Sequence, residues 1–302
     1  MRILLQFPEG LKQKALELSR KYESEGHEVF LSASACYGAC DIAIDEARWL
    51  KADKIIHFGH NRFVKTDLGV PVEYVEYGID IDVNELAAVL PHIKQYRSIA
   101  LATTVQHIHQ LGEMRAFFEK NGKKVFTAKG ERADKEGQVL GCDAGAVTKV
   151  AKDVDAVVFV GNGLFHPLAI EVGKPVFFYD TSAKKVQDVS AEAERLRKRR
   201  KGAIAKALTC RRFGILVSTK PGQFNLAQAE WAKKELRKRG LEAAILAANE
   251  LEPLSVNNFM VFDAYVTTAC PRMADDSEEW GRPLLTVTML KELFAIMDAN
   301  KG

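Results

Sequence analysis

One pattern constrains the fold of this chain of 302 residues more than any other: a strand, a polar loop, a helix and two more strands recur three times. The predicted strands are residues 2–7, 28–31, 54–58, 99–102, 124–126, 156–160, 213–217, 243–246 and 260–266. The predicted helices that follow the first strand of each copy are residues 11–22, 108–121 and 227–239. Alternating strands and helices indicate parallel sheets, so the sequence predicts an α/β protein.

We therefore expect three similar α/β domains, at residues 1–95, 96–205 and 206–302, with a linker helix at the end of the second. The loops that leave the carboxyl ends of parallel strands usually carry the functional residues. In each copy those loops are polar and contain glycine. Three such domains around a pseudo-threefold axis would aim their loops at one centre.

Composition narrows the class of protein. Hydrophobic residues make up 47% of the chain and charged residues 27%, as in ordinary globular proteins. The chain begins without a basic leader or a cleavage site, and it has no apolar stretch of about 18 residues, so we expect a cytoplasmic protein with no membrane contact. The net charge of +3 is too small to predict direct binding to nucleic acid.

A basic segment, Arg195 to Arg212, stands out within this even charge distribution. Its simplest interpretation is the solvated face of the linker helix. The alternative is a docking surface for an acidic or RNA-associated partner.

The five cysteines are an odd number, which argues against a disulfide framework and leaves buried thiols, a nucleophile or metal ligands. Cys40, Cys142 and Cys270 lie one per copy, in loops beside glycine, proline or a small residue. Three thiolates from three domains suit an iron–sulfur cluster, with zinc as an alternative. Cys36 and Cys210 are interpreted as a structural neighbour and a packing thiol.

Several segments together resemble the family of 2-(3-amino-3-carboxypropyl)histidine synthases of diphthamide biosynthesis, in the single-chain archaeal form, over nearly the full length. The segments are LQFPEGL at 5–11, YGACD at 37–41, FGH at 58–60, GQVLGC at 137–142, GNGLFH at 161–166, STKPGQ at 218–223 and TACPR at 268–272.

The resemblance implies a 4Fe-4S cluster on Cys40, Cys142 and Cys270, whose open iron binds S-adenosylmethionine. It further implies a radical enzyme that releases methylthioadenosine and transfers a 3-amino-3-carboxypropyl group to carbon 2 of a histidine imidazole in elongation factor 2. The implied partners are that factor, an electron donor and a second copy of the chain in a homodimer. Cys36-x-x-x-Cys40 lacks the third cysteine of ordinary radical enzymes, because Ala43 stands there.

Loop residues are the candidates for holding the co-substrate, because backbone amides of such loops bind anions and ribose. The candidates are Gln106, His107, Gly161, Asn162, Gly163, His166, Thr219, Gly222 and Gln223. Two other interpretations stay open at this point: a dehydrating enzyme similar to quinolinate synthase, and a non-catalytic iron–sulfur subunit for electron transfer.

Overall fold

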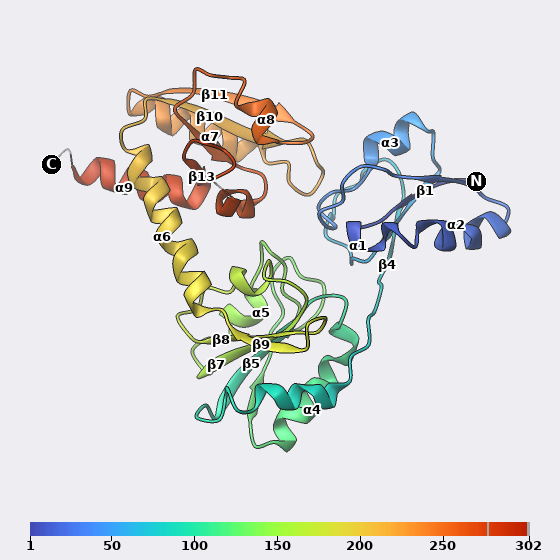
Figure 1. Ribbon diagram of the computed structural model, residues 1–302. Helices are drawn as coiled ribbons and strands as arrows, with labels where there is room; N and C mark the ends of the chain where they lie inside the picture. Colours follow the sequence, from blue (N-terminus) through green and yellow to red (C-terminus); the bar gives the residue numbers. More distant parts are fainter. Residues whose placement is uncertain (277, 301–302) are drawn as a thin grey trace. The chain divides into compact units, whose positions relative to one another are not determined.

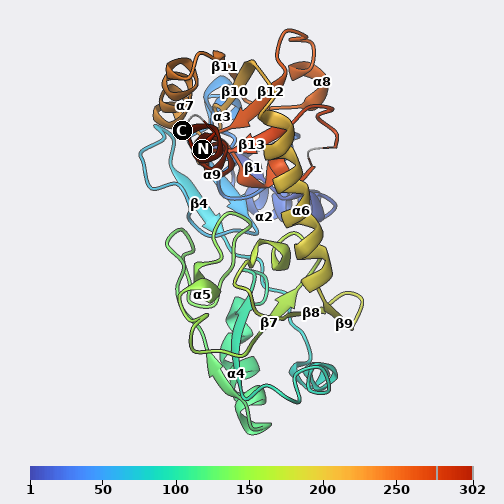
Figure 2. The ribbon, with the colours of Figure 1, turned by 90° about the vertical axis from the view of Figure 1, so that its left-hand side faces the viewer.

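The strands form three separate sheets in the computed structural model, which describes residues 1–276 and 278–300 (Figure 1). The first sheet holds β1 (Arg2–Gln6), β2 (Glu28–Leu31), β3 (Lys54–Phe58) and β4 (Val72–Val75). The second holds β5 (Ser98–Thr103), β6 (Lys124–Phe126), β7 (Ala156–Gly161), β8 (Val176–Asp180) and β9 (Lys185–Asp188). The third holds β10 (Arg212–Ser218), β11 (Glu242–Ala248), β12 (Ala264–Thr267) and β13 (Leu284–Thr286), with β10, β11 and β12 side by side in Figure 2.

All three sheets share one strand order. The orders are β2-β1-β3-β4, β6-β5-β7-β8-β9 and β11-β10-β12-β13, so the first strand of each copy lies between the second and the third. Every pairing is parallel except that of β8 with β9. The predicted α/β fold with parallel sheets is confirmed. In a sheet of this order, ligands bind beyond the carboxyl ends of the central strands.

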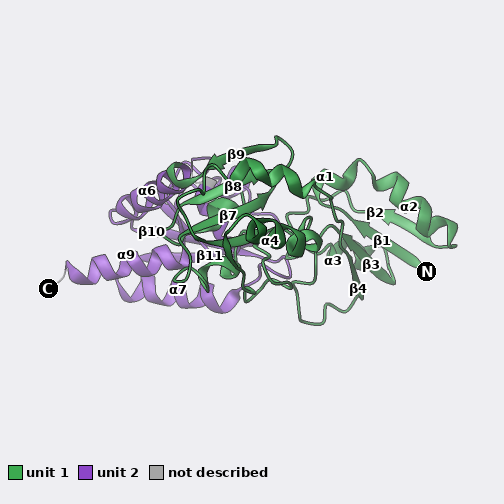
Figure 3. Cartoon of the chain, turned by 90° about the horizontal axis from the view of Figure 1, so that it is seen from below, with its two compact units in different colours: residues 1–191 green, residues 192–302 purple. Residues whose placement is uncertain are grey.

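Helices and short 3-10 turns connect the strands, and the chain divides into two compact units, residues 1–191 and 192–302 (Figure 3). The α-helices are α1 (Glu9–Lys12), α2 (Ala15–Ser24), α3 (Ile44–Trp49), α4 (Leu111–Lys120), α5 (Gly145–Thr148), α6 (Ser190–Ala207), α7 (Leu226–Lys238), α8 (Pro253–Val256) and α9 (Val287–Ala299). The 3-10 turns are η1 (Val83–Val89), η2 (Ile108–Gln110), η3 (Pro167–Ala169) and η4 (Pro271–Asp276).

The central strand β7 of the second sheet shows why a fully buried strand is apolar throughout. Along β7, Val158 and Val160 belong to the core on one face, whereas Val157 and Phe159 belong to the core on the other. Successive side chains of a strand point to opposite faces, so a strand covered on both sides must be apolar at every position. All six residues of β7 are buried.

One predicted strand begins too early. Residues 260–266 were expected to be extended, but β12 begins at Ala264, and Met260 is 80% exposed. The first residues of this apolar run form a surface turn instead. The strand starts only after Asp263, because its carboxylate accepts hydrogen bonds from the backbone N–H groups of Arg211 and Arg212.

The basic segment forms the larger part of α6 and is partly engaged in ion pairs. Arg200 contacts the Asp275 carboxylate at 2.7 Å, and Arg199 contacts Glu278 at 3.1 Å. The apolar side of α6, at Ala203, Ile204 and Ala207, packs in the core of the third sheet. No helix among the described residues is long and apolar enough to cross a membrane.

Candidate metal centre

Three cysteines lie in loops at the carboxyl ends of strands. Cys40 lies between β2 and α3, Cys142 between β6 and α5, and Cys270 between β12 and η4. All three are partly exposed. The third copy differs in position, because its cysteine follows the third strand of the copy, whereas Cys40 and Cys142 follow the second.

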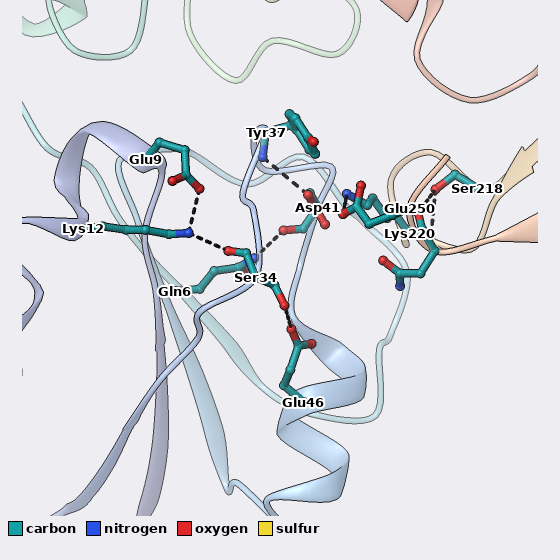
Figure 4. A network of polar contacts seen from close by, with 11 residues as sticks. Gln6, Glu9, Lys12, Ser34, Tyr37, Asp41, Glu46, Ser218, Lys220 and Glu250 are labelled. Atoms are coloured by element: carbon teal, nitrogen blue, oxygen red, sulfur yellow. Dashed lines mark hydrogen bonds and ion pairs between the residues drawn. The ribbon is translucent and has the colours of Figure 1, made fainter. Parts of the chain in front are cut away.

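The Gln6 side chain holds the segment that follows Cys40 (Figure 4). Gln6 Nε2 donates to the Asp41 carbonyl at 2.7 Å, and Gln6 Oε1 accepts from the Ala43 N–H at 3.1 Å. These two backbone contacts fix which end of the amide is oxygen. Gln6 is 1% exposed, so this clamp is shielded from water.

Two histidines extend the clamp into a chain of hydrogen bonds. Gln6 and His57 are partners in the register of β1 and β3, and their side chains meet with Oε1 and Nδ1 2.9 Å apart. His57 Nε2 lies 2.9 Å from His60 Nδ1. Gly59, with φ +78°, allows the turn that brings His60 back toward His57.

The fixed amide determines the tautomers along this chain. Gln6 Oε1 can only accept, so His57 must carry its proton on Nδ1 and keep a lone pair on Nε2. His60 then donates from Nδ1 and keeps its own lone pair on Nε2. Burial lowers the pKa of His57 to about 3 and that of His60 to about 4, so both rings are uncharged at neutral pH.

Cys36 lies beside these rings and is 4% exposed. Burial, with a smaller effect of the Asp41 charge, raises the pKa of its thiol to about 12. The loop that carries it is anchored at Ser34, whose carbonyl accepts from Lys12 Nζ at 2.9 Å and whose hydroxyl donates to Glu46 (Figure 4). Side chains of α1 and α3 therefore anchor the loop that carries Cys36 and Cys40.

The Asp143 carboxylate organises the loop of Cys142. It accepts hydrogen bonds from the backbone of Arg132 at 2.6 Å, Ala133 at 3.2 Å and Gly145 at 2.8 Å. Burial alone would raise the pKa of this carboxyl, but these N–H groups outweigh it and lower the pKa. Burial raises the pKa of the Cys142 thiol, and the Arg132 guanidinium partly offsets that effect.

Replacing Gly145 by alanine should disturb this loop. An added Cβ would lie 2.8 Å from both the Gly130 Cα and the Asp143 carboxylate, and the backbone cannot move aside cheaply. We expect Gly145→Ala to lower the free energy of unfolding by about 1–3 kcal/mol. Urea unfolding measures this. Gly202→Ala is the matched control, because nothing lies within 4 Å of its position in α6, and it should stabilise the chain slightly.

The loop of Cys270 begins with two threonines that close the end of β12. The Thr268 N–H and hydroxyl both donate to the Leu216 carbonyl at 3.0 Å, and Thr267 Oγ1 accepts from the Ala269 N–H at 3.2 Å. After the cysteine, Arg272 pairs with Asp275 at 2.7 Å. This buried ion pair fixes the turn on the carboxyl side of Cys270.

The residues of the second sheet that were predicted to bind the co-substrate differ in their solvent exposure. His107 is fully buried, and its Nδ1 donates to the Ile79 carbonyl at 2.8 Å. Its ring therefore links the loop after β5 to the segment before η1. Burial lowers its pKa. Asn162 and Gly163 are exposed, Gly161 is buried, and Gln106 and His166 are half-buried. The His166 ring stacks on Phe159, with centroids 6.3 Å apart.

The predicted residues of the third sheet lie in the turn after β10. Thr219 is exposed, while Gly222 and Gln223 are half-buried. Between them the Lys220 side chain is only 3% exposed and pairs with Glu250 at 2.5 Å (Figure 4). The Lys220 N–H donates to Ser218 Oγ at 3.2 Å, which shapes the turn.

Sequence reasoning did not select Gln6 or His57, and it did not single out Lys220 within the candidate loop 219–223. The pair of histidines three residues apart was a usable signal at the end of β3. The role of Gln6 had no local signal, because it depends on the pairing of β1 with β3.

Comparison with known proteins identifies the family of this chain. The model for diphthamide synthesis proteins matches residues 7–300. The chain belongs to this family. It is 38% identical to the 2-(3-amino-3-carboxypropyl)histidine synthase of Pyrococcus horikoshii, over 98% of this chain and 86% of that one. It is 30% identical to subunit 1 of the Schizosaccharomyces pombe enzyme, over 94% of this chain and 68% of that one.

The crystal structure of Dph2 from Pyrococcus horikoshii with a 4Fe-4S cluster has the same fold, with a TM-score of 0.88 over 98% of this chain and 86% of that one. The chain is thus an enzyme of the diphthamide synthesis family. Of the interpretations that the sequence left open, the histidine-modifying enzyme is the one that these relatives support.

Proposed function

We propose that the chain transfers a 3-amino-3-carboxypropyl group from S-adenosylmethionine to carbon 2 of a histidine imidazole in elongation factor 2, in the cytoplasm. The observation that carries the proposal is the placement of Cys40, Cys142 and Cys270 in loops at carboxyl ends of parallel strands, in a chain 38% identical to a named synthase. One cysteine would come from each of the repeats 1–95, 96–205 and 206–302.

The donor set fits an iron–sulfur cluster. Each of the three thiols is partly exposed and lies in a loop, whereas Cys36 is buried and Cys210 packs against the core of the third sheet. Thiolates are the usual ligands of such clusters. When bound, the cluster would supply the electron that breaks a carbon–sulfur bond of the sulfonium and would leave one iron open for the co-substrate. An external electron donor would have to reduce it.

Residues of this chain would position the cysteine loops and the co-substrate. The Gln6 clamp, the Asp143 carboxylate and the paired Arg272 each fix a segment beside a cysteine. Gln106, His166 and Gln223 are half-buried loop residues that would orient the sulfonium, whereas His107 is buried and donates to the Ile79 carbonyl. Orientation decides which carbon faces the electron source, and therefore which bond breaks.

Small-molecule products test the proposal directly. Anaerobically reconstituted and reduced protein should convert S-adenosylmethionine into methylthioadenosine, measured by chromatography. Protein without the cluster is the control. Predominant formation of 5′-deoxyadenosine would contradict the proposed transfer, because that product marks cleavage of a different carbon–sulfur bond.

Docking of elongation factor 2 would use the exposed part of the basic segment, in a homodimer of this chain. Lys198, Lys201 and Lys206 are exposed and have no ion pair among the described residues, unlike Arg199 and Arg200. Reversing these three charges should slow modification of the factor at low salt, and the defect should shrink as salt rises. An unchanged rate at low salt would contradict the role of these three lysines in docking. Light scattering would test the dimer separately.

A further inference from the structure

Cys36, His57 and His60 gather a second set of metal-ligating atoms, apart from the three loop cysteines. One ligand atom from each of the three lies within 4.8 Å of the others, and Cys36 and His57 are buried. In the described part of the chain, no other group of three His, Cys, Asp or Glu residues brings ligand atoms this close. We infer that these three residues form a site for a divalent cation of borderline softness, with zinc as the expected occupant.

The spacing is close to what such an ion needs. Zinc binds histidine nitrogen at about 2.0–2.1 Å and cysteine sulfur at about 2.3 Å, which places tetrahedral ligand atoms about 3.3–3.6 Å apart. His57 Nε2 and His60 Nδ1 are 2.9 Å apart. Opening this pair by a few tenths of an ångström would let an ion take the place of the Nδ1 proton of His60, which moves to Nε2 of the same ring. Cys36 is the third ligand and releases its thiol proton to solvent as it binds.

The surroundings of His57 match those of a metal ligand. A metal-bound histidine usually donates its other ring N–H to an oxygen that fixes the ring. His57 Nδ1 donates to Gln6 Oε1 at 2.9 Å, and Gln6 is itself fixed by the backbone of Asp41 and Ala43. The Nε2 lone pair therefore already faces His60, and no rearrangement of the strand is needed.

The site would join two segments that flank Cys40. Cys36 belongs to the loop after β2, whereas His57 and His60 lie at the end of β3. An ion bound to all three would fasten that loop to the sheet. This inference does not depend on the proposed transferase activity, because metal content and coordination are measured without any substrate.

The experiment uses the full chain, loaded with its iron–sulfur cluster, exposed to zinc and then freed of loosely bound metal. Elemental analysis should give about one zinc per chain, and zinc X-ray absorption should show one sulfur at about 2.3 Å with nitrogen or oxygen neighbours at about 2.0–2.1 Å. Cys36→Ser and His60→Gln should lose the zinc and keep the iron. Cys210→Ser and His109→Gln are matched controls that should keep both.

Three results would overturn the inference: wild-type protein that retains no zinc, test variants that retain as much zinc as the controls, or absorption spectra that show three sulfur neighbours. The spectrum of the wild-type protein decides the question even where a variant fails to fold.

Discussion

Each of the three single substitutions Cys40→Ser, Cys142→Ser and Cys270→Ser should reduce bound iron and sulfide to background after anaerobic reconstitution. Formation of methylthioadenosine should fall on the order of 100-fold or more, because a direct ligand contributes at least as much as the outer residues that orient one. The physical reason is that the hydroxyl of serine is a hard ligand with a much higher pKa than a thiol, so it does not replace a thiolate on iron.

The other two cysteines provide the control for this series. Cys210 packs against the core of the third sheet, and its Sγ lies 3.6 Å from the Asp263 carbonyl. Cys36 is buried beside His57 and His60. Cys210→Ser and Cys36→Ser should keep their iron and sulfide. A loss as large as that of the loop variants, in either one, would contradict the assignment of the cluster ligands.

Asp275→Asn should destabilise the second unit by about 3–5 kcal/mol, the usual cost of removing one partner from a buried ion pair. The Asp275 side chain is 6% exposed and contacts Arg200 and Arg272, each at 2.7 Å. Its loss would leave two guanidinium groups without this carboxylate, one of them only 9% exposed. Urea unfolding of the full chain would measure the change.

Glu278→Gln is the matched control for Asp275→Asn. Glu278 also pairs with an arginine of α6, but both side chains are exposed, at 80% for Glu278 and 42% for Arg199. Exposed pairs contribute about 0–1 kcal/mol. If Asp275→Asn cost no more than this control, the buried pair would not be what holds η4 in place.

The repeat of strands and helices could be predicted from sequence because buried parallel strands are apolar at every position. The strands found in this way include β5, β7 and β10. The fourth strand of each sheet was missed, although β8 is a strongly apolar run. The start of β12 was misplaced because apolar Met260 and Val261 lie on the surface.

Of the candidate site, the loop positions of Cys40, Cys142 and Cys270 could be predicted, since loop position and residue type are visible in sequence. The clamp of Gln6 on the Asp41 segment depends on a contact across 35 residues, and its contact with His57 depends on the register of two strands. Likewise, Arg199 and Arg200 looked like solvated charges, but their partners lie more than 70 residues away. Side-chain contacts between distant segments leave no local pattern.

Within residues 1–276 and 278–300, each of the three sheets is made of consecutive strands and includes no strand from another part of the chain. A growing polypeptide could therefore complete the first sheet while the rest is still being synthesised, since domains form in order from the N-terminus. The thiol of Cys270 emerges from the ribosome last of the three. Assembly of an inorganic cofactor on all three thiols would then be a late event in biogenesis, carried out on a polypeptide that has already folded.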